Sequence, residues 1–330
     1  LYLVVEILLT SNHLKLKYLF YSSLITVSFV SIDIITQYIL GYNLFGFMPW
    51  EGRIAGIFTS EGIGGSYIQK FSLFAIFGSL LFFQRNRSLI FFSLVVLVYL
   101  AIFVSSNKMS FILINTSILI LLLFGKNYRS LTALAFATSV MISIFLILVD
   151  SSMELKYKAF YKNIITTKTI EKNIDLNKTE IKTIEKKTIN LYSHTRIYFT
   201  AIESWKNRLV LGNGHKSFRI ICKNILQKKK NLACSTHPHN YHLEILHDYG
   251  LIGFVIILMF TLIKLYQLSR SYFSNNNNEK FKLFFLPISI LFLIEIWPIK
   301  STGMLLTTWN GTIVWLIISL TSIYTLSKKN

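Results

Sequence analysis

The stretch from Thr236 to Gly253 concentrates side chains that can move protons. Its sequence is Thr-His-Pro-His-Asn-Tyr-His-Leu-Glu-Ile-Leu-His-Asp-Tyr-Gly-Leu-Ile-Gly. Pro238 interrupts a preceding helix, and Asn240 is a favourable cap for a helix that begins after it. His239 is therefore predicted just before a helix N-terminus, where an imidazole can exchange a proton near neutral pH and phosphate is favoured. The alternative is that His239 is an interfacial polar residue that takes no part in a reaction.

Two arginines are candidates for binding an anion. Arg53 lies in a connection made pliable by seven glycines, at positions 41, 46, 52, 56, 62, 64 and 65. Arg196 begins a predicted amphipathic helix that reaches Trp205, and a cation at this end opposes the helix dipole, which suggests an anionic partner. The alternatives are an Arg53 that extends to lipid headgroups and an Arg196 paired with Glu203.

The histidines also permit a metal hypothesis. His237, His239, His242 and Asp248 contain His-x-His and His-x-x-His spacings that are compatible with zinc. No cysteine belongs to this cluster, and no second cluster accompanies it. We therefore predict no metal and no cofactor.

The composition places these residues in a membrane protein. Of 330 residues, 53% are hydrophobic and 15% are charged, the mean hydropathy is +0.52, and the apolar residues form long blocks. The net charge of +19 would suggest nucleic acid in a soluble chain, but the aromatic residues lie inside apolar runs. We therefore predict an all-α polytopic membrane protein that meets anionic lipid or phosphate-bearing substrates and no nucleic acid.

About 20 apolar residues are needed to cross a bilayer as a helix. Roughly eight runs approach this length, at about 16–40, 66–84, 88–106, 109–125, 131–149, 250–268, 281–298 and 307–326. The chain begins at Leu1, and its first nine residues are too short to span, so we expect the tail of a truncated helix there.

Lysines and arginines of the short connections predict the orientation. They gather on one side, which is therefore predicted to be cytoplasmic, at positions 15, 17, 85, 87, 126, 129, 270, 280, 282, 328 and 329. The other side is predicted to hold the connection 41–65 and a large loop. This gives N-terminal transmembrane helices in 1–149, a periplasmic loop in 150–249 and C-terminal transmembrane helices in 250–330.

The large loop divides in two. Residues 156–190 are rich in Lys, Thr, Ile and Asn and are predicted to be a solvated or weakly helical linker, or a basic arm on headgroups. From Tyr192 onward the segment is predicted to be structured, with a turn at Gly212-Asn213-Gly214. Cys222 and Cys234, the two cysteines of the chain, are either a disulfide or two unrelated thiols.

These motifs together resemble a known family. His239-Asn240, nine residues, Gly250, two residues and Gly253 resemble the signature of the O-antigen ligase and polymerase superfamily. Two further matches precede it in order along the chain, namely Arg53-x-x-Gly56-x-Phe58 with Gly64, and Arg196 with Trp205 and Leu211-Gly212-Asn213-Gly214. Family members usually have more spans before the first arginine, in keeping with an incomplete N-terminus.

The resemblance implies a GT-C-like fold and a site shared between distant residues. The donor would be an undecaprenyl-diphosphate-linked glycan, and the acceptor a hydroxyl of lipid A core or of another lipid-linked glycan, in the inner membrane with the active face periplasmic. Arg53 and Arg196 match the arginines that bind the diphosphate, and His239 matches the histidine proposed to activate the acceptor. Asn240 and Lys216 are further substrate-binding candidates. The reaction would need no metal.

Two other functions compete with this hypothesis. The residues do not separate a ligase from a polymerase. A transporter for the same lipid-linked glycan would need charges along its spans, where Asp33 and Glu295 are the main ionisable residues, with Glu6 in the first run. A structural membrane anchor would leave the arginines and His239 unexplained.

Overall fold

The computed structural model describes residues 2–11, 15–50, 53–159, 193–228, 232–274, 278–301, 303–305 and 307–322. The described part is built from helices and contains no strand, with one isolated bridge between Trp50 and Arg53. The predicted all-α class is confirmed. Most of the predicted linker 156–190 lies outside the described residues.

Each of the eight apolar runs coincides with a helix. The chain forms these helices because a continuous apolar run satisfies its backbone polar groups internally. Their bounds are α2 Leu16–Leu40, α3 Gly64–Phe82, α4 Arg87–Val104, α5 Lys108–Phe124, α6 Arg129–Val149, α10 Tyr241–Ser274, α11 Glu279–Glu295 and α12 Thr308–Leu320.

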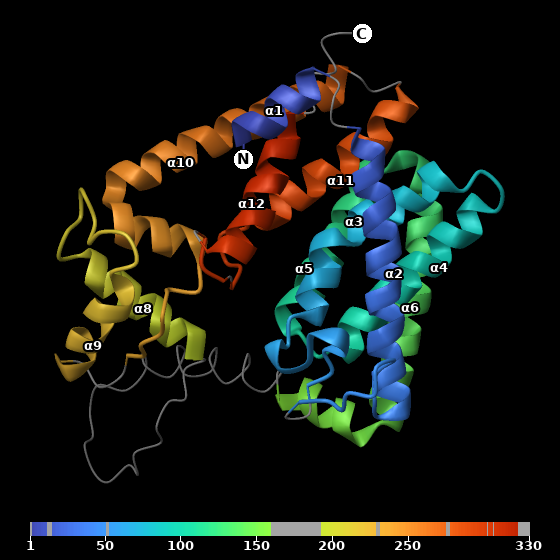
Figure 1. Cartoon of the computed structure of the whole chain (residues 1–330), viewed down its shortest axis with the longest axis horizontal. Coiled ribbons are helices and arrows are strands. Elements are labelled where there is room, and N and C mark those ends of the chain that lie inside the picture. The colour runs from blue at the N-terminus through green and yellow to red at the C-terminus, as the bar shows by residue number, and fades with distance from the viewer. Residues whose placement is uncertain are drawn as a thin grey trace, which may run out of the picture. The chain divides into compact units, whose positions relative to one another are not determined.

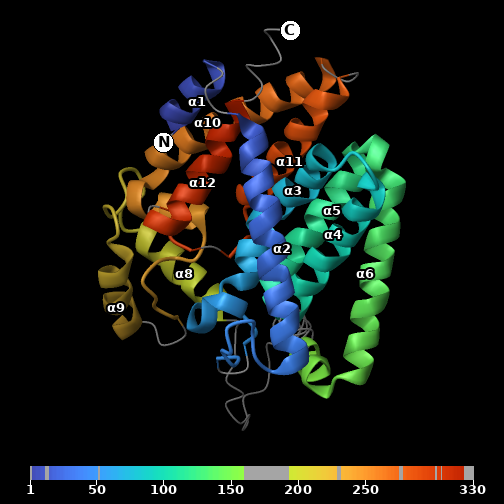
Figure 2. The same cartoon turned by 45° about the vertical axis from the view of Figure 1, so that its right-hand side comes forward.

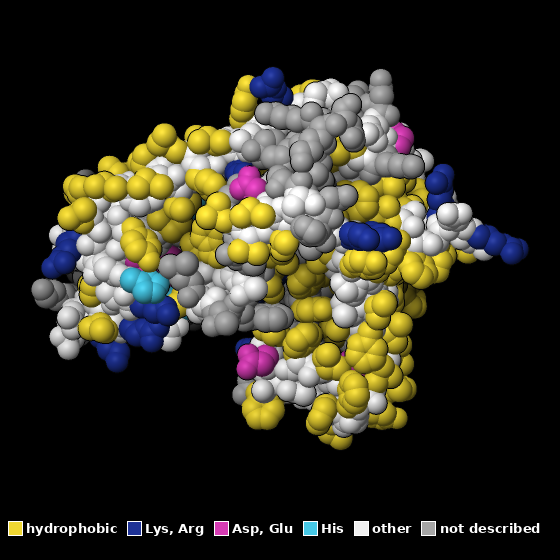
Figure 3. Space-filling model, turned by 45° about the horizontal axis from the view of Figure 1, so that its top comes forward, with side chains coloured by type: hydrophobic (Ala, Val, Ile, Leu, Met, Phe, Trp, Pro, Cys, Tyr) yellow, Lys and Arg dark blue, Asp and Glu magenta, His cyan; other side chains and the backbone are white. Residues whose placement is uncertain are grey.

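Among the described residues, four stretches are long and apolar enough to cross a membrane, by length and composition. They are Leu16–Leu40, Arg87–Val104, Lys126–Val149 and Tyr241–Ser274. The helices Lys108–Phe124 and Asn310–Leu320 are apolar but shorter. Hydrophobic side chains cover much of the face shown in Figure 3, as expected where lipid replaces water as the solvent.

Short helices complete the described chain. They are α1 Tyr2–Thr10, α8 Ser193–Trp205 and α9 Phe218–Lys228, with the 3-10 turns η1 Gly56–Glu61 and η2 Lys126–Tyr128. Helix α8 is the amphipathic helix predicted around Arg196, and it begins and ends close to the predicted residues.

The chain divides into two compact units. The first contains Leu1–Val149, Leu262–Trp297 and Thr312–Asn330, and the second contains Asp150–Thr261 and Pro298–Gly311. Arg53 belongs to the first unit, and Arg196, Lys216, His239 and Asn240 belong to the second. The segment Pro298–Gly311, called here the return segment, joins the second unit although it is distant in sequence.

The first unit is a bundle in which α2 packs on α3 and α4, and α11 packs on α3 and α5. Figures 1 and 2 show α2 to α6 lying side by side. Phe20 is fully buried at its centre, with ring centroids 5.3 Å from Phe74 and 5.0 Å from Phe284. Gly78 lets the backbones of α2 and α3 approach, because a Cβ there would lie 2.7 Å from the Phe20 carbonyl oxygen.

Two polar residues of α2 hold the glycine-rich connection 41–65. Asp33 Oδ1 accepts a hydrogen bond of 2.9 Å from the Leu44 N–H. Gln37 Oε1 accepts from the Ala55 and Gly56 N–H groups at 3.0 and 2.9 Å. Both side chains are buried, and because they are four residues apart they lie on one helix face. Asp33 therefore holds the connection 41–65 against α2.

Glu295, the other ionisable residue considered for a transporter, also has a partner within the first unit. Its carboxylate lies 3.9 Å from the Lys70 ammonium, and both side chains are largely buried. The two opposite charges therefore compensate each other inside the bundle. Asp33 and Glu295 thus both have partners within the first unit.

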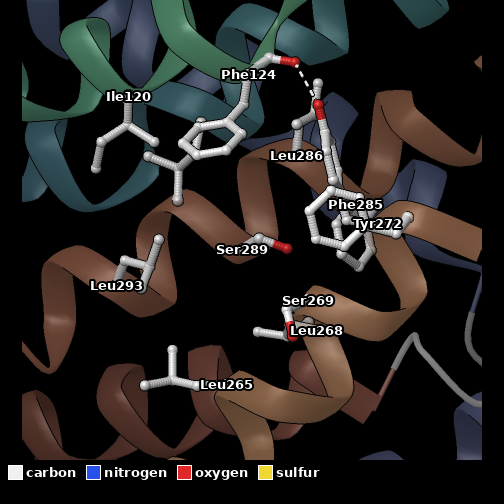
Figure 4. Close-up of a pocket in the computed structure, with 12 residues that line it drawn as sticks. Ile120, Phe124, Leu265, Leu268, Ser269, Tyr272, Phe285, Leu286, Ser289 and Leu293 are labelled. Atoms are coloured by element: carbon white, nitrogen blue, oxygen red, sulfur yellow. Dashed lines mark hydrogen bonds between the residues drawn. The ribbon is translucent and has the colours of Figure 1, made fainter. Parts of the chain in front are cut away.

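A cavity of about 190 Å³ lies between α5, α10 and α11 in the first unit. Figure 4 shows Ser289 directed into it, while the Tyr272 hydroxyl donates a hydrogen bond of 3.1 Å to the Phe124 carbonyl. The remaining lining is mainly aliphatic and aromatic, and no charged side chain takes part. The cavity therefore lacks the groups that an anionic diphosphate requires.

Candidate functional site

Helix α8 is fastened to the segment that leads to His239. The Arg196 guanidinium donates to the Leu232 carbonyl oxygen at 2.8 Å. One turn later, the Thr200 hydroxyl donates to the Ala233 carbonyl oxygen at 2.7 Å, and the Ala233 N–H lies 3.3 Å from the same hydroxyl. These contacts align the side chain of Arg196 with the chain that ends at His239.

Two further residues of α8 reach His239 itself. The Tyr198 hydroxyl donates to the His239 carbonyl oxygen at 3.3 Å, and the rings of His194 and His239 meet edge to face with centroids 4.8 Å apart. Arg196 therefore lies on a helix whose neighbouring residues contact His239. Both predicted site residues therefore belong to the second unit, with His239 in contact with His194 and Tyr198 of α8 and Arg196 in contact with Leu232.

His239 has an unusual backbone and a crowded side chain. Its φ is +56°, a left-handed conformation that costs energy for a residue with a Cβ and is often found at functional sites. The Ser235 hydroxyl lies 3.0 Å from His239 Nε2, and the His237 ring centroid lies 4.0 Å from that of His239. The tautomer of His239 decides whether Ser235 donates or accepts.

Burial makes His194 a neutral neighbour of His239. Burial lowers the pKa of His194, because its charged form loses solvation. His194 is therefore neutral near pH 7 and adds no positive charge beside His239. A neutral neighbour at edge-to-face distance restricts the orientation of the ring without competing for its proton.

Asn240 fixes the start of α10, as the sequence predicts. Its side-chain oxygen accepts from the Leu243 N–H at 3.1 Å, which is N-capping geometry. The amide nitrogen donates to the Pro298 and Lys300 carbonyl oxygens at 2.7 and 3.2 Å. Both ends of this buried amide therefore contact protein, so the structure gives Asn240 a positioning role beside His239. Its predicted contact with substrate stays a prediction.

The return segment is held along the first turns of α10 by further contacts. Glu244 accepts from the Leu305 N–H at 3.0 Å, and Asn310 donates to the Tyr241 hydroxyl at 2.6 Å. The Lys300 ammonium lies 5.9 Å from the centroid of the Tyr241 ring. Sequence reasoning missed this segment because its partners are about 60 residues away, as in the Glu244–Leu305 pair with a separation of 61.

His194 and Tyr198 were also missed as neighbours of His239. A usable signal was present, since the two residues are four apart on a predicted helix and therefore share one face. Arg196 drew attention by its charge alone. Ser235 carried no such signal. It lies four residues before His239 in an irregular segment, where no regular spacing predicts which way a side chain points.

The cysteines form a disulfide between Cys222 and Cys234, with Cα atoms 5.4 Å apart. This decides between the two alternatives that the sequence left open. The bond ties α9 to the segment that leads to His239, inside a cluster with Ile197, Ala201 and Phe218. It therefore restrains the chain one residue before Ser235.

Helix α10 bends at Gly250, where φ is +65° and ψ is −162°. The turn after α8 approaches the bend, and the Leu251 N–H donates to the Leu209 carbonyl oxygen at 2.9 Å. A Cβ on Gly250 would lie 2.3 Å from the Val210 carbonyl oxygen, and one on Gly212 would lie 2.4 Å from the Gly250 nitrogen. The close approach of these two backbones therefore explains why the motifs have glycine at positions 212 and 250. Figure 1 shows α10 as two segments that meet at a bend.

We predict that Gly250→Ala destabilises the second unit by more than Gly214→Ala does. Both positions have positive φ, which costs an alanine about 1–3 kcal/mol, but a Cβ on Gly214 meets no atom within 4 Å. Gly250→Ala adds a collision with backbone that cannot move aside. Thermal unfolding in detergent measures both variants, and equal losses of stability would contradict the close approach.

Lys216 lies on the turn after α8, and His247 lies on α10 before the bend at Gly250. The Lys216 N–H donates to Asp248 Oδ2 at 2.9 Å, and its side chain is exposed. His247 Nδ1 lies 2.7 Å from Asp248 Oδ1, with both side chains buried. Among the described residues, no three His, Cys, Asp or Glu are arranged to hold a metal ion. The structure therefore gives the zinc hypothesis no support.

Arg53, the remaining candidate, lies in the first unit. Its N–H donates to the Trp50 carbonyl oxygen at 2.8 Å, and its side chain is exposed. Within the described chain Arg53 forms no ion pair. Its Cδ and Nη1 atoms lie 3.8 Å from the place where a Cβ on Gly62 would stand, so the Arg53 side chain extends past this glycine. The guanidinium is thus presented on a connection that α2 holds firmly.

The fold defines an integral membrane protein whose second unit carries Arg196 and His239. The family model described as O-Antigen ligase matches residues 72–258, 187 of the 330 residues, and the chain belongs to this family. The match contains Arg196, Lys216, His239 and Asn240, and Arg53 precedes it. No curated protein sequence matches the chain. The family consists of membrane glycosyltransferases of the ligase and polymerase type.

Proposed function

We propose that the protein transfers a glycan from an undecaprenyl-diphosphate-linked donor to an acceptor hydroxyl, most simply as an O-antigen ligase acting on lipid A core. Family membership supports lipid-linked glycan transfer in polysaccharide biosynthesis. The observation that carries the site is the alignment of Arg196 with His239 through the contacts of α8. We further propose a GT-C-like fold with about eight spans, in the inner membrane.

The reaction follows from the charges that must move. The acceptor oxygen attacks the anomeric carbon of the glycan, a new C–O bond forms, and the bond from that carbon to the diphosphate oxygen breaks. The electron pair of the broken bond leaves on the diphosphate, and the proton of the acceptor hydroxyl passes to His239. A neutral imidazole suits this task near pH 7.

The arginines stabilise the negative charge that develops on the diphosphate leaving group. A guanidinium offers a planar fork of donors that fits phosphate oxygens, and such donors act most strongly where charge develops. Arg196 is held by its contact with Leu232, so it needs little reorganisation. We propose that Arg53 contributes the second guanidinium and that Lys216 and Asn240 support the substrate-binding region.

The disulfide supports the proposal that this region is periplasmic. Disulfides persist in oxidising compartments such as the periplasm and are rare in the cytosol. The bonded pair Cys222–Cys234 lies in the second unit, the same unit that carries His239. The orientation predicted from the lysines and arginines of the short connections agrees with this placement.

A transfer assay with one lipid-linked donor and two acceptors tests the function. With purified protein, labelled glycan should appear on lipid A core and not on a second lipid-linked repeat unit. Elongation of the lipid-linked glycan instead would establish a polymerase. Absence of transfer to both acceptors, by protein that is folded and inserted, would overturn the proposal.

We expect glycan transfer to continue undiminished in EDTA. Two guanidinium groups supply the positive charge that a divalent cation provides in other phosphate-dependent transferases, so chelation removes nothing that the reaction needs. Initial rates before and after chelation measure this. A loss of rate that added Zn²⁺ or Mg²⁺ restores would contradict the proposed mechanism.

A further inference from the structure

The turn that follows α8 exposes three consecutive apolar side chains. Leu209, Val210 and Leu211 are 49%, 57% and 75% exposed. The turn is well held, since the Trp205 indole donates to the Leu209 carbonyl oxygen at 3.0 Å. Such an exposed apolar tip on an ordered turn is costly in water and is typical of a surface that meets lipid or a partner.

Backbone hydrogen bonds fix this tip beside the point where α10 becomes continuously apolar. The Leu251 N–H donates to the Leu209 carbonyl oxygen at 2.9 Å, and the Ile252 N–H donates to the Val210 carbonyl oxygen at 3.3 Å. From there α10 exposes large apolar side chains, at positions 251, 252, 255, 256, 258 and 259. Since α10 is apolar enough to cross a membrane, the tip is fixed beside the start of the apolar part of a candidate span.

The charge around the tip has one sign. Residues 206–228 contain six lysines and arginines and no aspartate or glutamate. Arg208, Lys216 and Arg219 are exposed, as is His215. Of the nearby acids, Asp248 is buried against His247 and Glu203 pairs with Lys206. Figure 3 shows Lys and Arg side chains gathered beside a histidine and hydrophobic side chains.

We propose that residues 206–220 form a membrane-docking loop, in which Leu209–Leu211 insert between lipids while Arg208 and Arg219 bind anionic phospholipid headgroups. An apolar tip with flanking cations suits the interface, where tails and phosphates are within reach of one short turn. The loop continues directly from α8, so docking sets the depth of the helix that carries Arg196. The inference rests on membrane insertion of α10 and not on the proposed reaction.

Site-specific labelling of the full chain in lipid nanodiscs tests the insertion. Because Cys222 and Cys234 are bonded to each other, Leu211→Cys provides a single site for a bimane label. Lipids brominated on the upper acyl chain should quench this label, and aqueous iodide should not. Asn224→Cys, at an exposed position of α9, is the matched control and should show the opposite response. Equal iodide quenching at both positions would overturn the insertion.

A second measurement tests the headgroup. With the Leu211→Cys label, brominated phosphatidylglycerol should quench at lower mole fraction than brominated phosphatidylcholine, in membranes that contain no glycan donor. Arg208→Gln with Arg219→Gln should reduce this preference roughly 30-fold, since each interfacial cation contributes roughly 1 kcal/mol. Lys223→Gln, which removes a cation of α9 beyond the loop, should leave the preference unchanged. An unchanged preference in the double variant would refute the headgroup site.

Discussion

His239→Asn should reduce glycan transfer by at least about 100-fold, because a positioned general base contributes about 10²–10⁴-fold to a rate. Asparagine tolerates the left-handed backbone that His239 adopts, with φ of +56°. It retains a polar side chain but cannot take a proton near pH 7. The substitution therefore separates the chemistry of the imidazole from the strain of the position, which His239→Ala does less cleanly.

Initial rates with a saturating lipid-linked donor measure the effect, and thermal unfolding verifies that the variant is folded. His242→Ala is the matched control. It also removes an imidazole from this stretch. The His242 ring, however, packs near Phe254 of the same helix, with ring centroids 6.3 Å apart. The control should retain most of its activity. A His239→Asn protein that transfers glycan at the normal rate would refute the role of His239 as the base.

Arg196→Ala should reduce transfer by about 100- to 1,000-fold, the usual loss when a donor that stabilises developing negative charge is removed. The substitution also removes the hydrogen bond to the Leu232 carbonyl oxygen, so stability should fall by about 1.5–3 kcal/mol. Arg196→Lys keeps the charge and loses the planar fork. The activity of Arg196→Lys should lie between that of the unsubstituted protein and that of Arg196→Ala.

Thr200→Val separates the two effects of Arg196. Thr200 is fully buried and also ties α8 to the same segment, through its bond to the Ala233 carbonyl oxygen. Valine has a similar shape and cannot make that bond. If Arg196 acts on the diphosphate, Thr200→Val should lose stability but retain transfer. A loss of transfer in Thr200→Val as large as in Arg196→Ala would show that Arg196 acts only by holding the segment.

The helices were predictable because their physics is local. A run of apolar residues near the length of a bilayer specifies a helix whatever its neighbours are, and each predicted run coincides with one. The cap at Asn240 was predictable for the same reason, since Pro238 and Asn240 act on adjacent backbone. The helix around Arg196 followed from its amphipathic pattern.

The surroundings of His239 were only partly predictable. His194 and Tyr198 follow from helical spacing once α8 is known to face His239, but no rule of sequence states which helix does so. The return segment and Glu244 meet through a single backbone N–H, to which any residue except proline contributes the same group. Such a contact leaves no pattern in the sequence.

The sequence by itself determined that this is an all-α membrane protein with a histidine ahead of a capped helix and arginines outside the spans. Tertiary structure decided that α8, which carries Arg196, is hydrogen-bonded to the segment that ends at His239, that Asn240 holds the return segment, that His247 is buried against Asp248, and that the cysteines are bonded. The division has a physical reason. Periodicity, capping and apolar length act between neighbours in the chain, whereas a site is made by hydrogen bonds between residues that only folding brings together.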